Sequence, residues 1–177
     1  MHQFSHCLIL VLVISLYCCM TGRAEENSES PLEITRQAAS GAKINLTKWG
    51  YTLDGSVKSV REIDRFIQEN WDDEARKPVP DGLLAHDFGV IMFSLGCYVG
   101  EVLVNVGGEW HFDEDNPQWG MTATITMRDG TVCCPAQRFM KRLSQGPEND
   151  LYFYTWLLAK NVNGVAEDDD FTQMPLE

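Results

Sequence analysis

The chain has 177 residues, of which 44% are hydrophobic, and it carries 26 acidic against 14 basic side chains. This apolar fraction is ample for one folded domain and excludes a chain that is disordered throughout. The net charge of −12 argues against nucleic acid as a partner and against docking on anionic lipid. Both of those surfaces are bound by clustered Lys and Arg side chains.

The N-terminal segment has the pattern of an export signal. An uncharged apolar run, Cys7–Met20, is too short to span a bilayer comfortably, and small residues follow at Gly22 and Ala24. We expect cleavage after Ala24, which makes the mature protein periplasmic or secreted and leaves no stable membrane span. Because residues 1–6 contain no Lys or Arg, anchoring by an uncleaved N-terminal segment is the alternative.

Cleavage changes both the charge and the cysteine content. Residues 25–177 hold 13 basic and 26 acidic side chains, so the mature net charge is −13. Three cysteines remain, Cys97, Cys133 and Cys134. In an oxidising compartment they allow one disulfide and one leftover thiol.

The mature chain is expected to form a single α+β domain. We place a partly flexible leader at 25–52, the domain at 53–160 and an acidic flexible tail at 161–177. A short helix within 31–45 is an option in the leader, although its apolar spacing is poor. Apolar residues spaced i, i+3, i+4 predict amphipathic helices over 57–71 and 135–143, and Asp150 is expected to cap a last helix over 151–160.

Residues 82–106 are predicted to form the central buried helix. Its apolar stretch, 89–106, contains one charge, Glu101, and is close to the lower length limit of a transmembrane helix. Glu101 and Asn105 are poorly suited to lipid, and amphipathic segments flank this helix, so a buried position is favoured. The following pair, Gly107-Gly108, is expected to end it.

A β-hairpin is predicted over 119–134, because apolar and polar residues alternate before an Asp129-Gly130 turn. With a two-residue loop, Cys134 lies on the apolar face and Cys133 on the opposite face. We therefore expect the helices to pack on a small antiparallel sheet that contains this hairpin. We also expect Cys97 and Cys134 to form a disulfide or a close thiol contact, since a ring between adjacent cysteines is strained.

Three short motifs together resemble a group of small uncharacterised bacterial domains. Leu95–Glu101 reads L-G-x-Y-x-G-E, Gly107–Trp110 reads G-G-x-W, and Pro135–Leu143 reads P-x5-K-R-L. The resemblance extends over Leu53–Gly146. It implies an α+β domain of bacterial origin, sometimes found near toxin–immunity or secretion systems, without established catalytic residues. The signal-like start and the Cys133-Cys134 pair depart from that group.

The sequence favours neither a metal nor a cofactor. His111 with Asp113, Glu114 and Asp115 is similar to a metal loop, but the glycine that a calcium loop needs at its bend is missing. His86 and His111 are the two histidines of the mature chain, too few for a typical zinc site.

Glu101 is the acidic residue placed in the most apolar segment, where an unpaired carboxylate is costly. We expect a structural ion pair between Glu101 and Lys141 or Arg142, with Arg138 as a further candidate. The alternative is catalytic: Glu101 acts as a general acid of a small hydrolase, together with His111.

Whether the chain is an enzyme is uncertain from the sequence, and a binding role is favoured. We assign partner binding to Asp113, Glu114 and Asp115, in a loop that a scaffold holds, together with Trp110. The resulting hypothesis is a non-catalytic exported envelope protein that binds a basic protein, for example an immunity protein against a basic toxin. A small hydrolase and a structural envelope protein are the alternatives.

Overall fold

The computed structural model describes residues 29–163, in which the compact unit begins at Pro31. The helices are α2 (Pro31–Lys48), α3 (Val60–Asn70), α4 (Phe88–Asn105), α5 (Trp119–Thr122), α6 (Pro135–Gln145) and α7 (Leu151–Asn163). A hairpin of β1 (Trp71–Asp72) and β2 (Lys77–Pro78) accompanies an antiparallel sheet in the order β3 (Glu109–His111), β4 (Thr124–Thr126), β5 (Val132–Cys133). The expected α+β class is therefore confirmed.

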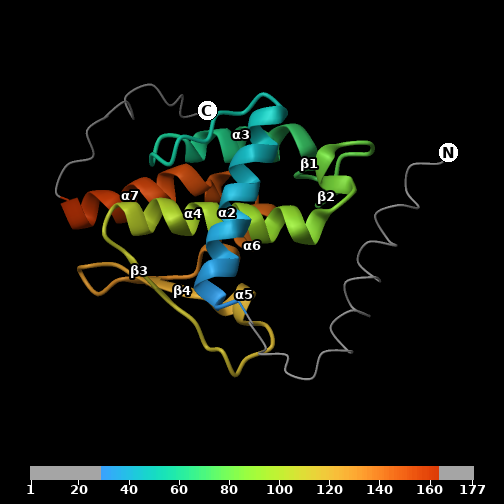
Figure 1. Ribbon diagram of the computed structural model, residues 1–177. Helices are drawn as coiled ribbons and strands as arrows, with labels where there is room; N and C mark the ends of the chain where they lie inside the picture. Colours follow the sequence, from blue (N-terminus) through green and yellow to red (C-terminus); the bar gives the residue numbers. More distant parts are fainter. Residues whose placement is uncertain (1–28, 164–177) are drawn as a thin grey trace, which may run out of the picture. The chain divides into compact units, whose positions relative to one another are not determined.

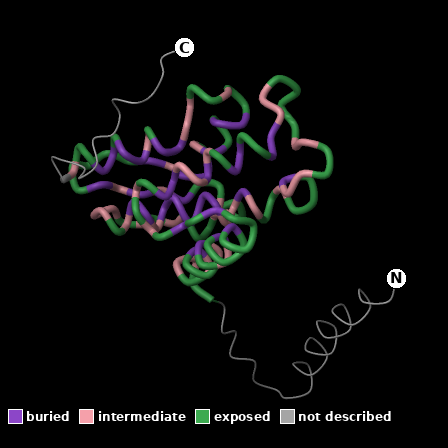
Figure 2. The backbone as a smooth tube through the Cα atoms, turned by 90° about the horizontal axis from the view of Figure 1, so that it is seen from above, coloured by how far each residue is buried: buried purple, intermediate pink, exposed green. Residues whose placement is uncertain are grey.

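Helix α4 lies at the centre of the unit. It contacts α2, α6, α7 and the sheet, and both Leu95 and Leu103 are completely buried. Buried positions gather in the interior of the unit (Figure 2). Within the described range, α4 is the one helix long and apolar enough to cross a membrane, yet 50% of it is buried inside the unit. This burial by protein is what a central core helix requires.

The region expected to be a leader contains the long helix α2, which lies across α4 (Figure 1). Its buried positions are Thr35, Ala39, Ala42 and Leu46, spaced four, three and four residues apart. Small side chains let the two helices approach closely, but they give a weak hydrophobic pattern in the sequence. The ordered unit therefore starts well before Leu53, where the sequence analysis placed the domain boundary.

The predicted end of the central helix is confirmed. The Gly108 amide donates to the Leu103 carbonyl at 2.9 Å, and the Gly107 amide donates to the Val104 carbonyl at 3.0 Å. Gly107 has φ +106°, the left-handed conformation that this helix-ending pattern requires and that glycine adopts without steric cost.

The first half of the predicted hairpin strand is wrong, because residues 119–122 form the short helix α5. Asn116 starts this turn: its side-chain carbonyl accepts the Gln118 amide at 2.9 Å, and its backbone carbonyl accepts the Trp119 amide at 2.9 Å. The Trp119 ring packs edge-on against Phe93 of α4, with centroids 6.1 Å apart. Local hydrogen bonds and this packing prevail over the alternating pattern.

The hairpin register also differs by one residue, because Ile125 pairs with Cys133. The Met127 amide donates to the Thr131 carbonyl, so the loop has three residues and ends with Gly130 at φ +84°. A slip of one residue exchanges the two faces of a strand. Cys133 is consequently the buried cysteine, 4% exposed, while Val132 is 59% exposed and Cys134 is half-buried.

The expected pairing of Cys97 with Cys134 is absent, since Cys97, Cys133 and Cys134 are all free thiols. Each faces a different element. Cys97 lies against Thr35 of α2, Cys133 against Tyr154 of α7, and the Cys134 thiol donates to a backbone carbonyl of α5 at 3.4 Å. Burial raises the pKa of Cys97 to about 12 and that of Cys133 to about 11, which keeps both protonated.

Two glycines on one face of α4 provide a test of this packing. A methyl group on Gly100 would lie 2.0 Å from Cζ2 of Trp110, whereas one on Gly96 would lie 3.5 Å from Cα of Ala136. Gly100→Ala should lower the free energy of unfolding by about 1–3 kcal/mol, because the indole must move. Gly96→Ala should be neutral or stabilising by up to about 1 kcal/mol, since alanine favours the helix. Urea unfolding that finds the two variants equally stable would contradict the packing.

Candidate functional site

Glu101 and Trp110 form a contact that joins α4 to the sheet. The indole lies in the space left by Gly100, and its Nε1–H donates to Oε1 of Glu101 at 2.8 Å. The expected ion pair of Glu101 with Lys141 or Arg142 is not found, because Glu101 faces β3 and Arg142 pairs with Asp73. Trp110 is thus occupied within the fold, although the sequence analysis assigned it to partner binding.

Glu101 and His111 are not brought together. Trp110 and Phe112 stack on each other, with ring centroids 5.5 Å apart, and therefore share one face of the β3 segment. Side chains alternate along a strand, so His111 lies on the opposite face, where it is exposed. The acid–base pair that the hydrolase alternative needs is therefore not built.

The acidic loop (residues 113–118) begins and ends at aromatic residues that touch each other. Phe112 meets Trp119 edge-on at 5.7 Å between centroids, and Trp119 meets Phe93 of α4 at 6.1 Å. We call these three rings the aromatic clamp. Because both ends of this short loop are fixed on α4 and the sheet, few conformations are open to its backbone.

The interior of the acidic loop is closed by Asn116. Its amide nitrogen donates to the Asp113 carbonyl at 3.0 Å, and its side-chain nitrogen donates to Oγ1 of Thr122 at 3.2 Å. Asp113, Glu114 and Asp115 are all exposed, as their sequence predicted. Throughout residues 29–163, this loop included, no three side chains of His, Cys, Asp or Glu gather as a metal site does.

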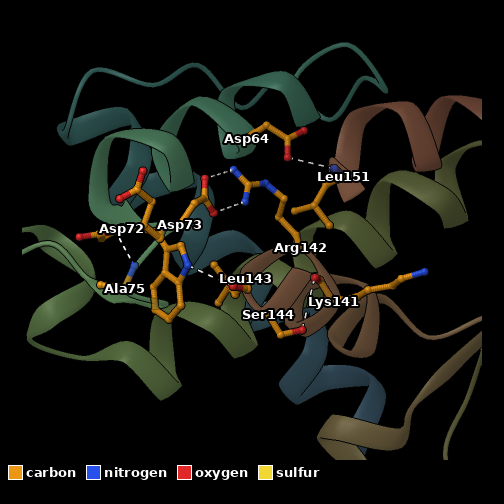
Figure 3. Close-up of polar contacts among 11 residues, drawn as sticks. Asp64, Asp72, Asp73, Ala75, Lys141, Arg142, Leu143, Ser144 and Leu151 are labelled. Carbon is orange, nitrogen blue, oxygen red and sulfur yellow. Dashed lines mark hydrogen bonds and ion pairs between the residues drawn. The ribbon is translucent and has the colours of Figure 1, made fainter. Parts of the chain in front are cut away.

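A buried arginine connects the C-terminal helices to the segment after α3 (Figure 3). Arg142 of α6 is 3% exposed and forms two bonds with Asp73: Nη1 to Oδ1 at 2.7 Å and Nη2 to Oδ2 at 3.3 Å. Next to it, Nε1 of Trp71 donates to the Leu143 carbonyl at 3.2 Å. Arg142 is therefore structural, as expected, but its partner is Asp73. The neighbouring Lys141 is exposed and forms no ion pair with a described residue.

Two carboxylates cap the start of α7. Asp64 of α3 accepts the amide of Leu151 at 2.9 Å (Figure 3). It also accepts the amide of Tyr152 at 2.8 Å, and Asp150 caps the next amide. Burial raises the pKa of Asp64 to about 6, with a smaller raising contribution from the charge of Asp150. The amide bonds and the charge of Arg142 act in the opposite direction. Sequence reasoning found Asp150 as the cap and missed Asp64.

Comparisons with family models, with curated proteins and with solved structures found no match to this chain. The resemblance to small bacterial domains therefore remains a prediction. In the described structure, residues of these motifs contact one another. Gly96 and Gly100 of L-G-x-Y-x-G-E lie against Ala136 and Trp110. Glu101 of the same motif accepts the indole N–H of Trp110, the tryptophan of G-G-x-W.

Breaking the Arg142–Asp73 pair should strongly destabilise the fold. Asp73→Ala leaves the guanidinium buried without its counter-ion, and we expect the free energy of unfolding to fall by about 3 kcal/mol. The matched control is Glu74→Ala, at a neighbouring exposed side chain, which should change it by less than about 0.5 kcal/mol. Urea unfolding measures both. Equal effects of the two substitutions would show that the buried pair contributes nothing.

Asp64 should make stability depend on pH. Its pKa is about 6 in the folded state against an ordinary 3.8, so the folded state binds more protons between these values. This stabilisation is complete below the ordinary pKa and is lost as pH rises through about 6. Relative to Asp64→Asn, the free energy of unfolding should fall by about 2–3 kcal/mol between pH ~4 and ~7. A carboxyl signal of Asp64 that titrates near its ordinary value in NMR would contradict this.

Proposed function

We propose that this chain is a non-catalytic, exported protein of the bacterial cell envelope that acts by binding a basic protein. Immunity against a basic toxin is one function of this kind. The observation that carries the proposal is the acidic loop, in which Asp113, Glu114 and Asp115 are adjacent, exposed and held between Phe112 and Trp119. A structural envelope protein is the alternative, and it requires no such recognition surface.

The acidic loop is suited to recognition because the scaffold fixes it. Binding residues are often found on loops that rigid elements position, and a loop ordered in advance loses less entropy when a partner binds. The net charge of −13 in residues 25–177 adds a long-range field that attracts a positively charged partner and speeds its encounter. Export is supported separately, by the apolar run Cys7–Met20, which lies outside the described residues.

The first test uses the product of the reading frame next to this gene, purified as the candidate partner. Its association rate constant should fall steeply as salt rises, because exposed charges are screened beyond about 8 Å at physiological ionic strength. Asp113→Asn, Glu114→Gln and Asp115→Asn combined should slow association about tenfold at low salt, with a small effect on dissociation. Surface plasmon resonance separates the two rates.

The matched control removes the same charge elsewhere. Glu74→Gln, Asp81→Asn and Asp87→Asn combined neutralise three exposed acids that lie outside the acidic loop. This variant should slow association less than the loop variant. A purified partner whose association rate responds to neither salt nor the loop variant would refute the proposal.

A further inference from the structure

A second, differently charged feature lies between β5, α6 and α7. It is a cleft of about 340 Å³, open to solvent, and its lining combines polar, thiol and cationic side chains. The polar, thiol and cationic residues are Cys133, Cys134, Gln137, Arg138, Lys141 and Tyr154, beside the apolar Val132. None of them belongs to the acidic loop, to the aromatic clamp or to the Arg142–Asp73 pair.

The cleft is built by one face of α6. Cys134 directly precedes the helix, and Gln137, Arg138 and Lys141 follow it at the three-, four- and seven-residue spacings that place side chains on one side. These cleft residues therefore form a stripe at helical spacing in the sequence. The two cationic residues, Arg138 and Lys141, lie on adjacent turns of α6.

Two contacts hold Arg138 in position, and neither is with a carboxylate. Its guanidinium lies over the Tyr154 ring at 4.6 Å from the centroid, and Nη2 donates to the backbone carbonyl of Asp150 at 3.2 Å. Its Nε is buried, so a ligand would reach the guanidinium from the Nη side. These contacts orient the planar group before any ligand arrives, at little further entropic cost.

No described carboxylate neutralises the charge of Arg138 or Lys141. In the part of the chain that the structure describes, neither side chain forms an ion pair, whereas Arg65 and Arg142 both pair with carboxylates. Like charges three residues apart on a helix repel each other. An anion placed between them relieves this repulsion and gains a fork of donors from arginine and a mobile charge from lysine.

We propose that this cleft binds a small oxyanion, a phosphate or carboxylate group, between Arg138 and Lys141, with the Gln137 amide as a further donor. The class of ligand follows from the donors: a planar guanidinium, an ammonium and a carboxamide supply N–H groups to oxygen. The site is independent of the proposed partner binding by the acidic loop, so either proposal can fail without the other.

The test titrates the purified protein with inorganic phosphate and, separately, with acetate, at constant ionic strength maintained with chloride. NMR chemical shifts should saturate and map to residues 133–141 and to Tyr154. Lys141→Gln should weaken binding about tenfold, the loss expected from one charge-assisted hydrogen bond. Lys141 is exposed, so this variant should keep the melting temperature of the parent.

The matched control is Lys43→Gln, which removes one exposed lysine from α2 and should leave binding unchanged. Arg138→Lys keeps the charge but removes the fork, and should also weaken binding. A bound anion should further slow alkylation of the half-buried Cys134 by iodoacetamide. Saturation by phosphate or by acetate identifies the group that is recognised.

Two results would overturn the proposal. One is the absence of saturable binding for both probes. The other is equal binding by Lys141→Gln and Lys43→Gln, which would mean that the response reflects general charge and not the cleft.

Discussion

The packing of the Trp110 indole against Gly100 is the contact on which the rest of the sheet and its loops depend. The indole occupies space that any side chain at position 100 would fill, and its N–H is bound by Glu101 one residue further along. The chain leaves α4 through Gly107 and Gly108 and is fixed two residues later. A methyl group on Gly108 would lie 2.5 Å from Ile125 of β4, so the second strand is equally constrained. Close packing of this kind fixes the direction in which the chain runs from α4 into the sheet, because few arrangements of side chains fill the same space.

Much of the fold could be predicted from the sequence, because strong periodic signals coincide with helices. The stripe predicted over 57–71, the helix predicted over 82–106 and Pro135 at a helix start correspond to α3, α4 and α6, although α3 begins at Val60 and α4 at Phe88. Helix α2 was underestimated because its buried face is made largely of alanine and threonine. The hairpin register was missed because a three-residue loop with glycine in its last position is also favourable, like the two-residue loop that was expected. The added loop residue shifts the strand pairing by one, which exchanges the two faces of the strand.

The site was harder to predict, since it depends on which distant side chains meet. The exposure of Asp113, Glu114 and Asp115 could be predicted from composition, whereas the partners of Glu101 and Arg142 could not. Arg142 meets a carboxylate 69 residues earlier in the chain, and three neighbouring acids, Asp72, Asp73 and Glu74, were equally plausible in sequence. The cationic face of α6 was visible as a run of basic residues. The position of α7 decides whether these charges share a cleft with the thiols of Cys133 and Cys134, and the sequence does not reveal that position.

The cap that α3 provides for α7 bears on the order in which the molecule can be completed. Asp64 accepts an amide 87 residues later in the chain, and an aspartate buried without that partner is costly. Until α7 takes its place, the carboxylate of Asp64 lacks the two amides that it accepts in the folded unit. The buried polar group of α3 therefore depends on the last of the described helices.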